Sequence, residues 1–174
     1  MGEEVWYATI VGVIVLSGLS IFYILYLAKM RRTKTNAAWK QAATELGLDF
    51  TPATRIFGKY RMSGVIGKQL SCSVWAYTEP NGQGGYTTFM NYDVRFSQPL
   101  NKVKELLTPN IQSKLLEVNN VLKKVVVSDD SINSTRVSGF IRKSEILIQN
   151  VKLLIQLAEL IIPNEEVDSI FEEI

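Results

Sequence analysis

The chain has 174 residues, of which 47% are apolar and 21% are charged, with 19 basic and 17 acidic side chains. This length holds one domain of ordinary size and a short appendage. Residues 1–34 carry two acidic and four basic side chains, whereas residues 35–174 carry 15 of each. Because the larger part is neutral, it has no general attraction for phosphates, and we expect no nucleic-acid partner.

The composition also excludes several kinds of active site. The chain has no histidine, so a Ser–His–acid triad cannot form, and its single cysteine excludes an intrachain disulfide. That cysteine, Cys72, shares a predicted strand face with apolar residues, which favours burial over reactivity. Asp93 and Arg95 share a strand face that we expect to be solvated. We therefore expect a non-enzymatic protein without a metal or a cofactor.

Residues 5–28 form the most apolar part of the chain, with 24 residues and no charged side chain. A helix of this length reaches roughly 36 Å, enough to cross a hydrocarbon core of about 30 Å. Aromatic side chains lie near both ends, as they do at membrane interfaces: Trp6, Tyr7, Tyr23 and Tyr26. A cleaved signal peptide would have its basic residues before the apolar run and not after it. We therefore predict a transmembrane helix.

Four basic residues follow this span directly, and none precedes it: Lys29, Arg31, Arg32 and Lys34. The positive-inside rule then places the N-terminus outside the cell and the rest of the chain in the cytoplasm. We predict a single-pass protein of the cell membrane, with residues 1–4 outside, a basic juxtamembrane segment over 29–35 and a cytoplasmic domain over 36–162.

Small residues lie along the predicted span. Ala8 and Gly12 form a small-xxx-small pair, and Ser17 and Ser20 follow. Small side chains let a second helix approach closely, so these four residues are candidate contacts with another membrane helix. The alternative is that Gly and Ser are simply common in membrane-spanning helices.

The rest of the chain alternates between helical and strand patterns. We predict helices over residues 35–46, after Pro99, after Pro109 and over 144–162, strands over 48–50, 60–65, 69–78 and 86–96, and a hairpin of 121–128 with 132–141. The three middle strands form an antiparallel meander. The charges of Glu145, Lys152 and Glu159 would be costly in lipid, so the last long helix belongs to a core. The fold class is therefore α+β.

Residues 163–174 predict a short acidic amphipathic helix. Its apolar residues follow the spacing i, i+3, i+4 and i+7: Val167, Ile170, Phe171 and Ile174. Five acidic residues take the other face. This helix either packs on its own domain or docks in the groove of a partner.

Three segments carry a resemblance to known proteins: Trp39…Leu46-Gly-Leu-Asp-Phe50, the turn Gly64-x-x-Gly67, and Leu106-Leu-Thr-Pro…Leu115-Leu. They resemble the corresponding parts of a group of prokaryotic membrane-anchored proteins of unknown function. The resemblance covers most of residues 36–162 and rests on structural motifs. It implies an anchored cytoplasmic α+β domain, and it supplies no catalytic residues.

Two functional hypotheses follow. The first is an accessory, assembly or scaffold subunit of an integral membrane complex, with a protein partner in the membrane. The second is a membrane-tethered binding module for a small apolar or lipid-like ligand, in which Trp75, Tyr77, Met90 and Tyr92 would line a pocket.

Overall fold

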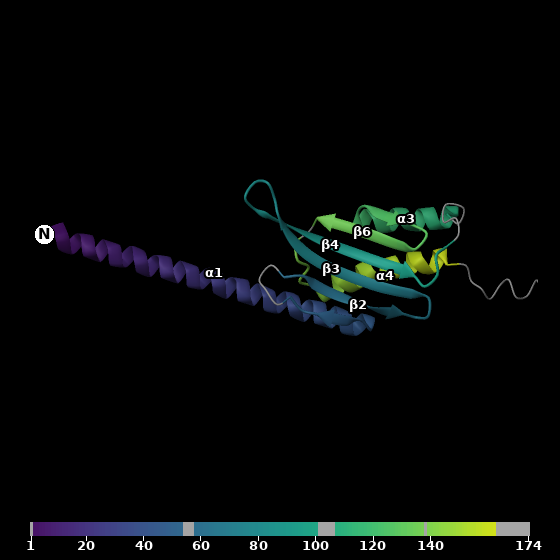
Figure 1. Cartoon of the computed structure of the whole chain (residues 1–174), viewed down its shortest axis with the longest axis horizontal. Helices are drawn as coiled ribbons and strands as arrows, with labels where there is room; N and C mark the ends of the chain where they lie inside the picture. Colours follow the sequence, from purple (N-terminus) through teal and green to yellow (C-terminus); the bar gives the residue numbers. More distant parts are fainter. Residues whose placement is uncertain (1, 54–57, 101–106, 138, 163–174) are drawn as a thin grey trace, which may run out of the picture.

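The computed structural model of the chain describes residues 2–53, 58–100, 107–137 and 139–162 (Figure 1). Its helices and strands are, in chain order, α1 (Gly2–Leu46), β1 (Asp49–Thr51), β2 (Tyr60–Ile66), β3 (Leu70–Pro80), β4 (Tyr86–Phe96), α3 (Pro109–Leu122), β5 (Val125–Val127), β6 (Ser131–Val137) and α4 (Ser144–Ile161). A long apolar N-terminal helix, a six-stranded antiparallel sheet and two further described helices confirm the predicted α+β class.

The sheet has the strand order β1-β2-β3-β4-β6-β5, and every neighbouring pair is antiparallel. β2, β3 and β4 are the predicted meander, and β1 adds an edge strand beside β2. The predicted hairpin is also present, with β6 inserted between β4 and the edge strand β5. It begins later than expected, because α3 continues to Leu122. Lys123 and Lys124 then reverse the chain with positive φ angles of 62° and 46°.

The apolar helix and the helix predicted over residues 35–46 are one continuous helix, α1. The basic segment between them contains neither Gly nor Pro, so nothing in it interrupts the helical hydrogen bonds. Gly47, with a φ of +68°, follows the helix end in the left-handed conformation typical of a glycine there. In the described part of the chain, α1 alone is long and apolar enough to cross a membrane, and its most apolar window has no buried residue.

The three helices pack on one face of the sheet and enclose the core. From α4, Leu147, Val151, Leu154 and Ala158 are buried, which confirms α4 as a core helix. The strands bury alternate residues as their pattern predicts, which are Leu70, Cys72, Val74 and Ala76 of β3 and Met90, Tyr92, Val94 and Phe96 of β4. Between α4 and the sheet, the Asn150 side-chain amide donates to the Tyr92 hydroxyl at 2.9 Å.

The last turns of α1 belong to the same core. Trp39, Ala42 and Ala43 are buried almost completely. The Trp39 ring lies 5.6 Å from the ring of Tyr60 on β2, whose ring in turn lies 5.0 Å from that of Phe140. One helix is therefore exposed and apolar at its N-terminal end and part of the domain core at its C-terminal end.

Two predicted helices cannot be compared with the structure. The helix after Pro99 falls mostly on residues 101–106, and the acidic helix falls on residues 163–174. Both segments lie outside the described residues.

Candidate functional site

The second face of the sheet is not covered by any helix of the described chain (Figure 1). Strand register arranges its side chains in rows that cross β2, β3 and β4. Arg61 is paired with Trp75, Ser63 with Ser73 and Ser73 with Asp93, and Ser71 with both Val65 and Arg95. Residues 30 positions apart in sequence, such as Ser63 and Asp93, thus lie in one row.

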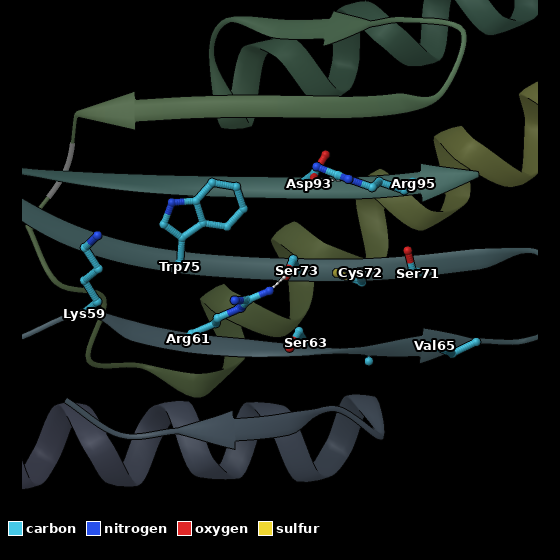
Figure 2. Close-up of a pocket in the computed structure, with 11 residues that line it drawn as sticks. Lys59, Arg61, Ser63, Val65, Ser71, Cys72, Ser73, Trp75, Asp93 and Arg95 are labelled. Carbon is cyan, nitrogen blue, oxygen red and sulfur yellow. Dashed lines mark hydrogen bonds and ion pairs between the residues drawn. The ribbon is translucent and has the colours of Figure 1, made fainter. Parts of the chain in front are cut away.

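A groove of about 600 Å³ lies on this face (Figure 2). Its floor is low because short side chains occupy adjacent positions: Ser63, Gly64, Ser71 and Ser73. Longer side chains form its borders, which are Lys59, Arg61, Val65, Trp75, Asp93 and Arg95. The groove therefore exists because small residues occupy the centre of this sheet face and longer side chains surround them.

The charged groups of the groove are mainly basic. Arg95 donates to the Asp93 carboxylate at 2.8 Å, and this bond raises the pKa of Arg95 above its ordinary value. Arg61 donates to the Ser73 hydroxyl at 3.3 Å, and no carboxylate of the described residues pairs with it (Figure 2). With Lys59, the groove has three cations and one anion. Guanidinium and hydroxyl donors side by side suit a carboxylate or another oxyanion.

The expectation that the face of Asp93 and Arg95 is solvated is correct only for Arg95, whose side chain is 67% exposed. Asp93 and Asn91 are buried. Neighbouring strands on both sides of β4 surround them, which a single-strand pattern cannot show. Asn91 accepts a hydrogen bond from the Thr135 hydroxyl at 2.7 Å, while its side-chain nitrogen has no partner among the described atoms.

Cys72 points toward the core, as its alternation predicts. Burial, reinforced by the nearby Asp93 charge, raises the pKa of its thiol to about 12. The thiol is therefore neutral and protected at physiological pH.

The aromatic residues expected to line one ligand pocket are divided between the two faces of the sheet. Met90 and Tyr92 are buried under the helices, whereas Tyr77 stacks on Phe89 on the open face, with ring centroids 5.4 Å apart. Trp75 borders the groove. No single pocket in the described part of the structure contains all four.

The basic residues after the apolar segment have two different environments. Lys29, Arg31 and Lys34 are exposed on α1. Arg32 is half-buried and donates to the backbone carbonyl of Ala53 at 2.8 Å, so it also attaches α1 to the domain.

The small residues of α1 do not form one stripe. At about 100° per residue, Ala8 and Gly12 lie about 40° apart around the helix axis, whereas Ser17 lies about 140° from Gly12. The Ser20 hydroxyl donates to the Leu16 carbonyl of its own helix at 2.8 Å. Ala8 and Gly12 thus share one face, whereas Ser17 and Ser20, about 60° apart, share another. The candidate docking residues Val167, Ile170, Phe171 and Ile174 lie outside the described residues.

The groove was not predicted from the sequence, although a signal for it exists. Arg61-x-Ser63, Ser71-x-Ser73-x-Trp75 and Asp93-x-Arg95 are all polar at alternate positions. Pairing the three strands through the Gly67 turn and the loop over residues 81–85 would have placed these residues in one patch. The chain matches no family model, no curated protein and no solved structure. These comparisons therefore give no support to the resemblance to prokaryotic membrane-anchored proteins. The function has to be inferred from the geometry of the chain.

Proposed function

We propose that this protein is a non-enzymatic, single-pass membrane protein that serves an integral membrane complex as an accessory, assembly or scaffold subunit. Its domain lies in the cytoplasm and binds a protein partner of the same membrane. The groove on the open sheet face receives an acidic segment of that partner.

The continuity of α1 is the observation that carries this proposal. Ala28 ends the apolar run, and Arg32, four residues or about 6 Å further along the helix, already contacts the domain. Trp39 then anchors the helix in the core. A span joined to a domain without a flexible linker holds that domain at a fixed height beside other proteins of the membrane.

The charges of the groove support a protein partner with acidic side chains. The cation of Arg61 lies next to hydroxyl groups and is exposed enough to exchange its bond with Ser73 for a carboxylate. Hydrogen bonds between a guanidinium and a carboxylate are among the stronger contacts at protein interfaces. Trp75, at the border of the groove, is a residue type that often contributes much of the binding energy. Ala8 and Gly12 provide a second candidate contact, within the membrane.

A tagged purification from native membranes in mild detergent tests this function. We expect a companion protein in stoichiometric amount with the wild-type chain, and its loss with Arg61→Glu. Lys40→Glu is the matched control. Lys40 is exposed on α1, so its substitution makes the same change of charge at a position away from the groove. Replacing Gly12 with Leu should weaken recovery through the membrane contact. Equal recovery with the wild type, Arg61→Glu and Gly12→Leu would contradict the proposal.

A further inference from the structure

The β3–β4 hairpin extends beyond the rest of the sheet. β2 begins at Tyr60, which pairs with Ala76, and β6 ends at Val137, which pairs with Phe89. The pairs from Thr78–Thr88 to Pro80–Tyr86 therefore have no described strand on either side. We call this two-stranded extension, residues 78–88, the ribbon.

The two strands of the ribbon are joined by hydrogen bonds of their own. The Thr78 and Thr88 hydroxyls are hydrogen-bonded across the strands at 3.2 Å. At the tip, the Asn81 side-chain oxygen accepts from the Gly85 backbone N–H at 2.7 Å, and the Asn81 backbone N–H donates to the Gly85 carbonyl at 2.8 Å. Isolated two-stranded hairpins are only marginally stable in water, so a projecting ribbon of this kind is well suited to contact another surface.

The ribbon points back along α1 toward its apolar end (Figure 1). The Tyr60 ring lies 5.6 Å from Trp39, which fixes the level of Tyr60 along α1. From Ala76, the partner of Tyr60, β3 continues four residues to Pro80, or about 13 Å. The same length of α1 contains about nine residues, which brings the tip level with about residue 30. Along the helix axis the tip thus lies at about the level of Ala28, where the apolar run ends.

Basic residues lie at the same end of the domain. Phe140 contacts Tyr60, and the exposed Arg142 and Lys143 follow it directly before α4. The domain as a whole is also basic when the acidic residues 163–174 are set aside, because residues 35–162 carry 15 basic and 10 acidic side chains. Such an end is attracted to a leaflet that contains anionic lipids.

We propose that the ribbon tip, together with Arg142 and Lys143, rests on the anionic headgroup layer of the membrane that α1 crosses. Tyr86 closes the ribbon next to its tip with 61% of its surface exposed, and tyrosine is enriched in this layer. The contact would fix the tilt of α1 and its domain relative to the membrane plane and so set the angle between the groove and the membrane. This inference rests on the proposed membrane crossing of α1.

Fluorescent labels on single cysteines in the full chain test the contact. In a Cys72→Ala background, an environment-sensitive dye is attached at Gln83→Cys in the tip, and the protein is reconstituted in vesicles of phosphatidylcholine and phosphatidylglycerol. We expect quenching by lipids that carry a quencher at the headgroup. The control is Lys68→Cys in the β2–β3 turn, at the opposite end of the sheet, which should stay unquenched. Equal behaviour of the two labels would overturn the inference.

Two further arms separate the possible causes. A label at Leu16→Cys, at the centre of the apolar run, reports whether α1 inserts when the lipids carry the quencher on their acyl chains instead of the headgroup. Quenching at Leu16 without quenching at Gln83 would refute the headgroup contact alone, whereas no quenching at Leu16 would refute the membrane anchor and with it the proposed function. Arg142→Glu with Lys143→Glu, or vesicles of phosphatidylcholine alone, should reduce quenching at Gln83. Unchanged quenching in both would overturn the assignment to anionic lipid.

Discussion

Single residues of this chain have environments that their neighbours in sequence do not reveal. Arg32 belongs to a basic run, yet its side chain bonds the backbone of Ala53. Asp93 and Arg95 alternate like residues of a solvated face, but Asp93 is buried between strands and holds Arg95 in place. Distant segments create both environments, because Ala53 accepts the bond of Arg32 and the strands β3 and β6 flank Asp93 on either side.

Cys72 gives the clearest prediction at this scale. Its folded pKa of about 12 lies above the ordinary value of 9.0, so above pH 9.0 the folded state keeps a proton that the unfolded state releases. The resulting stabilisation is complete below pH 9.0 and is lost as the pH rises toward 12. The free energy of unfolding should therefore fall by up to about 1.4 kcal/mol per pH unit in this window.

Denaturant unfolding of the detergent-solubilised chain at about pH 8 and about pH 10 measures this loss. Cys72→Ala is the control, because it removes the thiol and keeps the other titrating groups. The variant should be less stable than the wild type at the lower pH, since it leaves a cavity, but should lose less stability between the two values. An equal loss in both proteins would show that Cys72 does not titrate as its burial requires.

At the scale of elements, the sequence patterns predicted those segments whose periodicity is strong. The alternation from Leu70 to Ala76 and the apolar spacing of Leu147, Val151 and Leu154 identified a half-buried strand and a core helix, and burial confirms both. The continuity of α1 was missed because residues 29–34 are charged and carry no apolar period. The projection of the ribbon was missed because it depends on where β2 and β6 end.

The candidate site illustrates the same difficulty. Ser63, Ser73 and Asp93 form one row only after three strands have been aligned, so no window of sequence contains the groove. Its floor is a set of small residues, and small polar residues on a strand are by themselves ordinary surface. The sequence therefore predicted the layers of the fold. It did not predict the register between strands, which brings the residues of the groove together.

The continuity of α1 is itself testable. Thr33→Pro removes the helical N–H at residue 33 and clashes with the carbonyl of Lys29, at a cost of about 3 kcal/mol, just before the first buried residue of α1, Thr35. We expect a kink between the apolar segment and an otherwise folded domain. Spin labels at Phe22→Cys and Lys68→Cys should give a narrow distance distribution in the wild type and a broad or shifted one in this variant.

Thr33→Ala is the matched control for this substitution, since it removes the same side chain and keeps the backbone hydrogen bond. Its distance distribution should equal that of the wild type. A broad distribution in the wild-type background would contradict a rigid connection between the span and the domain.

At the scale of the whole molecule, charge is separated along the length of the chain. The exposed cations Lys29, Arg31 and Lys34 follow the apolar segment, and the folded domain adds a basic excess, while five of the acidic residues fall in 163–174. Basic side chains resist transfer across a membrane during insertion, so this arrangement favours retention of the domain on the cytoplasmic side.

A membrane-impermeant maleimide measures that orientation in intact cells. In the Cys72→Ala background, Glu4→Cys should react from outside, and Lys68→Cys should react only after the cells are permeabilised. Reversing the exposed cations with Lys29→Glu, Arg31→Glu and Lys34→Glu should produce a mixed population, in which both positions react in intact cells. Arg32 is left unchanged because its bond to Ala53 attaches α1 to the domain, so the triple variant alters the charge and keeps the fold. Reaction of Lys68→Cys in intact cells without the charge reversal would place the domain outside, and the proposed contact with a cytoplasmic partner would then fail.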